Sequence, residues 1–150
     1  MKIFFVSLII SLISISAFAQ EIAYPEKENL RSEFELKINN IPKVEGEVRV
    51  AVFDSKENYD SKENPLHAFV LTVEGDSLTW KHDELPYGEY AIAVYHDENE
   101  NGELDTNLLG IPKEAYGFSN NARGRFGPAS WKDAVFEISE SRTTHQITIN

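Results

Sequence analysis

The chain has 150 residues, and its 14 Lys and Arg against 25 Asp and Glu give a formal net charge of −11 at pH 7. This excess of negative charge argues against nucleic-acid binding, because phosphate contacts need clustered cations. It equally disfavours adsorption to anionic lipid, and it is compatible with binding cations. The sequence has no cysteine, so it offers neither a disulfide framework nor a thiol for a lipid anchor.

The first 19 residues have the pattern of a signal peptide. Lys2 precedes an apolar stretch over residues 3–16, and residues 17–19 (AFA) form a small-x-small cleavage site. A retained membrane anchor is the alternative, but the apolar stretch is short for a membrane span. The sequence therefore predicts export to the periplasm or the exterior, with a mature chain that starts at Gln20 and has no transmembrane segment.

A flexible lead-in is expected over residues 20–31, followed by one domain over residues 32–150. Apolar and polar residues alternate with period two in most of this domain, which is typical of half-buried β-strands. Seven strands are predicted, around residues 34–38, 48–53, 69–73, 78–82, 90–96, 134–138 and 147–149. This pattern predicts an all-β, antiparallel, seven-stranded sandwich. The strand near residues 90–96 is apolar on both faces and is therefore expected to be central.

The segment over residues 97–132 is far longer than an ordinary connection between sandwich strands, and such loops are usually functional or disordered. Its aromatic residues and glycines argue against disorder. We therefore expect one long inserted loop that carries the functional surface of the domain.

This loop begins with a pattern similar to an EF-hand calcium loop, over residues 97–108. The first, third, fifth and ninth positions of the pattern are Asp97, Asn99, Asn101 and Asp105, each with a side-chain oxygen, and Gly102 stands at the sixth, where the chain turns sharply. Glu103, at the seventh, would offer its backbone carbonyl. Alternate residues of a tight loop bring oxygens to one point, as a hard divalent cation requires.

The twelfth position, where an EF-hand has a bidentate Glu, is Leu108, and no flanking helices are predicted. The last ligand would be Asp105 binding through both oxygens, Asn107, a remote carboxylate or water. With two anionic ligands, calcium affinity is expected on the order of 10⁻⁴–10⁻³ M. The alternative is a polar turn without metal, because Asp, Asn and Gly favour turns by themselves.

Residues 85–136 (LPYGEYAIAVYHDENENGELDTNLLGIPKEAYGFSNNARGRFGPASWKDAVF) resemble an exported bacterial family catalogued as domain of unknown function 2141. The portion GIPKEAYGFSNNARG is the most specific, and Ala129 departs from the family pattern, in which a second proline is typical. The resemblance implies a secreted sandwich of transthyretin-like or immunoglobulin-like type without an established activity. It does not by itself imply calcium binding.

The rest of the long loop allows two interpretations for its cations and two for its aromatics. Arg123 and Arg125 would either clamp an anion or neutralise nearby glutamates. Tyr116, Phe118 and Trp131 would either form a platform for carbohydrate or peptide, or pack as a small core of the loop itself.

Catalysis has weak support in the sequence. No HExxH, CxxC or GxSxG motif is present. His96 shares a face with apolar residues of its strand and is expected to be structural. The hydrolase alternative would use His96 with Arg123 and Arg125. The preferred prediction is an exported, calcium-binding interaction module whose partner is a carbohydrate, a peptide or another envelope protein. The other alternative is a metal-independent structural or adhesin-like envelope domain.

Overall fold

The structure is a computed structural model that describes residues 30–150. The expected signal peptide and nearly all of the expected lead-in therefore lie outside the described residues. Strand β1 begins at Arg31. Among residues 30–150, no helix is long and apolar enough to cross a membrane.

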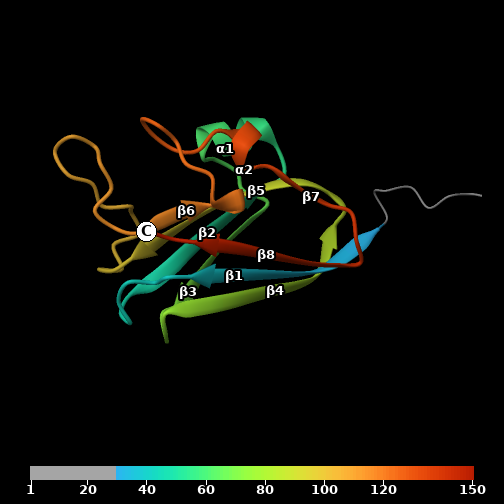
Figure 1. The fold of residues 1–150 in the computed structure, drawn as a ribbon, viewed down its shortest axis with the longest axis horizontal. Coiled ribbons are helices and arrows are strands. Elements are labelled where there is room, and N and C mark those ends of the chain that lie inside the picture. Colours follow the sequence, from blue (N-terminus) through green and yellow to red (C-terminus); the bar gives the residue numbers. More distant parts are fainter. Residues whose placement is uncertain (1–29) are drawn as a thin grey trace, which may run out of the picture.

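Two β-sheets form the fold (Figure 1). The first has the strand order β4 (Ser77–Pro86), β1 (Arg31–Asn39), β8 (Arg142–Thr148). The second has the order β3 (His67–Thr72), β2 (Glu47–Phe53), β5 (Gly88–Asp97), β6 (Tyr116–Phe118), and β7 (Phe136–Ile138) also pairs with β5. The described pairs are antiparallel except that of β1 with β8, which is parallel.

The main core lies between the two sheets. Period-two alternation places Phe34, Leu36 and Ile38 of β1 on one buried face, and Ile147 of β8 joins them. The second sheet contributes Val48, Val50, Val52, Tyr90, Ile92 and Val94. Burial of these branched and aromatic side chains from both sheets is the main stabilising contribution, at about 25 cal/mol for each Å² of apolar surface removed from water.

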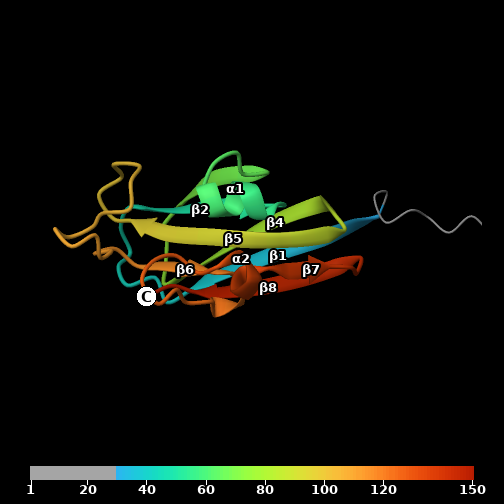
Figure 2. The same cartoon turned by 90° about the horizontal axis from the view of Figure 1, so that it is seen from above.

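A second, smaller core covers part of the outer face of the second sheet. The helices α1 (Lys56–Ser61) and α2 (Trp131–Ala134) contribute to it, and the 3-10 turn η2 (Ser119–Asn121) lies between two of its residues, Phe118 and Ala122. The helices α1 and α2 lie side by side (Figures 1 and 2). Ser55 caps α1, and Ser130 caps α2, through side-chain oxygens that accept backbone N–H groups.

The predicted all-β class and the dominance of antiparallel pairing are confirmed, and the arrangement is consistent with a sandwich. Strand β5 is central, as expected, with β2 and β6 as neighbours. The predicted count of seven strands is not confirmed: residues 30–150 contain eight, and β6 was not predicted because three residues are too short for a visible alternation. The predicted strand at residues 134–138 also began too early, because Ala134 ends α2.

Candidate functional site

The segment between β5 and β6 contains the predicted calcium loop and is called the acidic loop here (residues 97–115). It projects at the end of the molecule opposite to the start of β1, next to the C-terminus (Figures 1 and 2). Backbone hydrogen bonds between Tyr116 and Asn150, at 3.4 and 3.2 Å, hold the end of this loop to the C-terminal residue. The loop is therefore anchored by strands on both sides.

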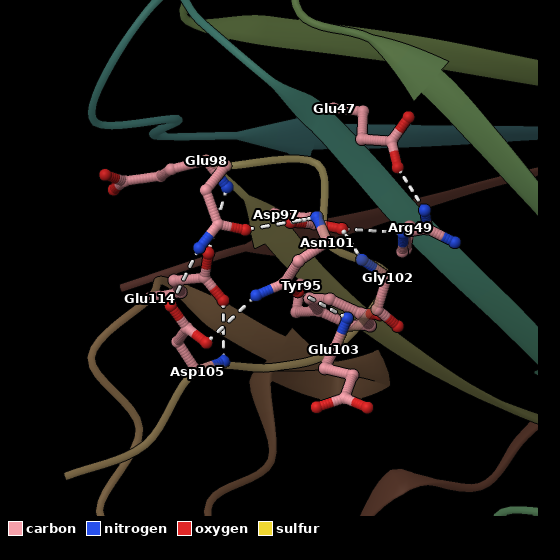
Figure 3. Close-up of polar contacts among 11 residues, drawn as sticks. Glu47, Arg49, Tyr95, Asp97, Glu98, Asn101, Gly102, Glu103, Asp105 and Glu114 are labelled. Atoms are coloured by element: carbon pink, nitrogen blue, oxygen red, sulfur yellow. Dashed lines mark hydrogen bonds and ion pairs between the residues drawn. The ribbon is translucent and has the colours of Figure 1, made fainter.

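Asp97 organises the first turn of the acidic loop. Its carboxylate is fully buried at the end of β5; Oδ1 accepts the backbone N–H of Asn101 at 3.0 Å, and Oδ2 accepts that of Gly102 at 2.7 Å (Figure 3). Oδ2 also accepts from Arg49 Nε at 2.8 Å, and Arg49 forms a further ion pair with Glu47. Burial raises the pKa of Asp97, but the hydrogen bonds from Gly102 and Arg49 outweigh it and hold that pKa below its ordinary value.

The three other predicted side-chain ligands form one cluster. Asn99 Nδ2 donates to Asp105 Oδ2 at 2.9 Å, and Asn101 Nδ2 donates to Asp105 Oδ1 at 3.1 Å. The two amide oxygens accept backbone N–H groups, Asn99 Oδ1 from Asn101 and Asn101 Oδ1 from Glu103, at 3.1 and 2.8 Å. The structure therefore brings Asn99, Asn101 and Asp105 together, with Asp97 hydrogen-bonded to the same turn.

Glu114 is a structural element of this loop that the sequence did not predict. Its side chain is 7% exposed, and its two carboxylate oxygens accept the backbone N–H groups of Glu98 and Asp105 at 3.0 and 2.8 Å (Figure 3). Glu114 thus ties the beginning of the loop to its middle. A spacing of 16 residues from Glu98 gave no local signal, because this contact exists only after the chain has turned back on itself.

The geometry of the loop depends on two glycines, Gly102 within it and Gly46, which lies against its start. Gly102 has φ +86, in the left-handed region that favours glycine, and Tyr95 donates its hydroxyl to the Gly102 carbonyl at 2.9 Å. Gly46 has φ +68, and a Cβ there would lie 2.3 Å from the carbonyl oxygen of Asp97. Any larger residue at position 46 would therefore displace the start of the loop.

The side chains at the remaining positions of the predicted motif, Glu103, Asn107 and Leu108, are not part of the cluster around Asp105. Asn107 Oδ1 accepts the N–H groups of Leu109 and Ile111 at 2.9 and 3.1 Å, so this side chain closes its own turn. Leu108 is fully exposed, and Glu103 is exposed as well. Across residues 30–150, no three His, Asp or Glu side chains are grouped closely enough to hold a metal ion by themselves.

His96 is fully buried on the core face of β5, and its Nε2 lies 2.7 Å from the carbonyl oxygen of Glu45. Because a carbonyl only accepts, Nε2 carries the proton, and Nδ1 is left as a buried acceptor without a partner in the described chain. This geometry fits the structural role that the sequence predicted for His96. Within residues 30–150, no hydrogen bond joins His96 to Arg123 or Arg125.

Among residues 30–150 no ion pair joins Arg123 or Arg125 to a glutamate, so both interpretations of the two loop arginines stay predictions. Arg123 donates to Asn150 Oδ1, and Arg125 is exposed. Two of the nearby acids have other partners, since Glu98 pairs with Lys43 and Glu114 accepts backbone N–H groups.

Three aromatic residues of the long segment, Tyr116, Phe118 and Trp131, belong to the second core, whereas Phe126 is fully exposed. The Tyr59 ring of α1 lies 6.3 Å from Phe118 and 5.8 Å from Trp131, and Phe118 lies 6.0 Å from Tyr116. Tyr59 donates its hydroxyl to the Ala129 carbonyl at 3.0 Å, and burial raises its pKa. Phe118 is therefore buried in a small core, and Tyr116 and Trp131 pack against it while each retains some accessible surface.

A protein-family model described as an uncharacterized protein conserved in bacteria (DUF2141) matches residues 36–146. The chain belongs to this family. The match extends beyond the residues that suggested the resemblance, and it includes the acidic loop together with most strands of both sheets. No curated protein and no solved structure matches the chain of this DUF2141 member.

Proposed function

We propose that this DUF2141 protein is an exported interaction module whose acidic loop binds calcium. The observation that carries the proposal is the convergence of oxygen-bearing side chains from alternate residues. Asn99 and Asn101 both reach the carboxylate of Asp105, and Asp97 accepts N–H groups of the same turn. The predicted signal peptide supports export, and a transthyretin-like or immunoglobulin-like sandwich is the proposed fold type.

A calcium ion would take the place of the two amide N–H donors that compensate the charge of Asp105. Rotation of the Asn99 and Asn101 amides would then direct their oxygens towards the ion, since Ca²⁺ accepts amide and carboxylate oxygens in flexible geometry. The Arg49 guanidinium already contacts one oxygen of Asp97. It reduces the charge available to a cation, so the expected affinity is weak.

The proposed role of the ion is to fix the shape of the loop for a partner. Leu108, Leu109 and Ile111 are exposed at 105%, 83% and 55%, and they lie in the loop that calcium would order. Large exposed apolar side chains grouped in one segment mark interaction surfaces. A peptide, a carbohydrate or another envelope protein is the proposed class of partner.

A metal-independent envelope or adhesin-like domain is the second candidate, and one observation favours it. Asp97 and Glu114 together accept four backbone N–H groups and one guanidinium, so protein groups already satisfy the turns of the loop. The hydrolase alternative has no comparable support, because His96 is fully buried.

Thermal unfolding of the purified protein in EDTA and then in millimolar calcium tests the proposal. Calcium at about ten times its dissociation constant adds about 1.4 kcal/mol, a Tm rise of several degrees. Asp105→Asn removes a negative ligand that is half-buried beside the exposed Asn99 and Asn101, and we expect it to abolish the rise while leaving the Tm in EDTA nearly unchanged.

Glu103→Gln is the matched control, because it removes one negative charge from the same loop at an exposed side chain. It should retain the calcium response. Equal melts with and without calcium, together with no heat in a calorimetric titration, would refute calcium binding and leave the metal-independent domain. A response lost equally in Glu103→Gln would show diffuse charge screening rather than a site.

A further inference from the structure

The outer face of the second sheet carries an apolar slot of about 590 Å³, separate from the acidic cluster. The loop that follows α1 supplies Lys62 at its lining, and the 122–130 segment supplies Pro128. The acidic loop supplies Leu104. The volume is in the range of small-molecule sites in proteins.

Strand register explains why the slot exists. Ala68 of β3 pairs with Ala51 of β2, and Ala51 pairs with Ala93 of β5, so three alanines form one row across the sheet. The next row contains larger residues, Val70, Arg49, Tyr95 and Tyr116. Phe118, opposite Ala93, closes the end of the alanine row. Short side chains between tall ones leave a depression whose floor is apolar.

Two cations line this otherwise apolar slot, and they differ in their partners. Arg49 is engaged by Asp97 and Glu47. In the described part of the chain Lys62 forms no ion pair, although the negative charge of Asp60 acts to raise its pKa. Its ammonium donates to the Tyr59 carbonyl and lies 3.5 Å from the centroid of the Tyr59 ring and 5.9 Å from that of Phe118. Burial lowers the pKa of Lys62, which indicates that its charge is incompletely compensated.

We propose that this slot binds an amphipathic carboxylate, with its apolar body over the alanine row and its carboxylate at Lys62. The unpaired ammonium beside aromatic rings supplies the charge complementarity, in a chain whose net charge of −11 would otherwise repel anions. The proposal deepens the proposed function, because it rests on the domain being a binding module. It does not require calcium.

Dodecanoate and dodecanol, titrated into the protein by calorimetry in EDTA and again in calcium, separate the apolar and anionic parts of the recognition. We expect both to bind and dodecanoate to bind about fivefold more tightly, because an exposed charge pair contributes little more than this. Ala51→Leu fills the middle of the alanine row and should weaken both ligands at least about tenfold. Thr144→Leu adds apolar volume at an exposed position of β8 and should change neither.

Lys62→Met should remove the preference for dodecanoate and leave dodecanol unaffected. Lys56→Met is the matched control, because Lys56 lies on α1 but pairs with Asp60. Lys56→Met should retain the preference. Unfolding curves for all four variants identify any that fails to fold. If Ala51→Leu does not fold, Ala93→Gly replaces it. Because Ala93→Gly enlarges the slot, it should shift the preference of the slot towards larger ligands.

Three results would overturn the proposal. Absence of binding in both buffers would show that the slot has no amphipathic ligand. A rise of the Tm in calcium, measured on the same preparation, would leave the calcium proposal intact. Equal affinity for dodecanoate and dodecanol would remove the carboxylate from the proposal. Concentration-dependent dimerisation that Ala51→Leu prevents would make a second copy of the chain the occupant.

Discussion

The sandwich core and the acidic loop are ordered by different forces. The core is held by apolar side chains such as Leu36 and Ile92, which are fully buried between the sheets. The acidic loop contains few buried apolar residues, and two buried carboxylates, Asp97 and Glu114, hold it by accepting backbone N–H groups. Apolar burial is non-directional and tolerates small changes of geometry, whereas the loop depends on a few oriented hydrogen bonds.

The largest expected effect concerns the core. Leu36→Ala leaves a cavity between the sheets and should lower the free energy of unfolding by about 2–5 kcal/mol. Denaturant unfolding measures it. Lys37→Ala, on the opposite face of the same strand, is the control and should have a much smaller effect. Equal losses for the two variants would mean that β1 does not pack as described.

Asp97→Ala should cost less in stability than the core variant, about 2–3 kcal/mol, because it leaves two backbone N–H groups and Arg49 without their acceptor. The loss should be local, with faster amide hydrogen exchange at Asn101 and Gly102 and little change in β1. Glu98→Ala is the neighbouring control, since Glu98 pairs at the surface with Lys43. Similar exchange in both variants would contradict the role given to Asp97.

Glu114→Gln should cost about 1 kcal/mol, since the amide keeps one acceptor oxygen and loses the other. Faster hydrogen exchange is expected at the amides of Glu98 and Asp105, which donate to Glu114. Unchanged exchange at both amides would show that Glu114 does not tie the loop together.

The smallest effect expected is a pH dependence from His145. Its ring stacks on Phe136 at 4.1 Å, its Nε2 accepts the backbone N–H of Asn120 at 3.1 Å, and burial lowers its pKa below the ordinary value of about 6.5. His145 therefore binds a proton more readily in the unfolded chain than in the folded one. Stability should be complete above about pH 6.5 and fall as the pH drops towards the lower folded pKa.

Denaturant unfolding at a series of pH values measures this dependence. His145→Phe keeps a stacking ring and should remove this part of the slope, although it loses the bond from Asn120. A slope that is identical in the variant would assign the dependence to other groups, such as His67, whose pKa burial also lowers.

The strands were predictable because each one carries its own alternation of apolar and polar residues. The alternation in β1, β2 and β5 is visible in a few consecutive residues, and burial on folding follows the same period. The cluster of Asn99, Asn101 and Asp105 was predictable for a similar reason, since alternate residues of a tight turn meet. Strand β6 was not, because three residues carry no periodic signal.

By itself, the sequence determined the all-β class, the central place of β5 and the composition of the acidic loop, since local periodicity and turn chemistry specify them. Only the tertiary structure decided that Glu114 and Arg49 hold this loop and that His96 is buried. It also decided that alanines of three strands meet in one row. These features join residues far apart in the chain, and strand register, which no single segment encodes, sets which of them meet.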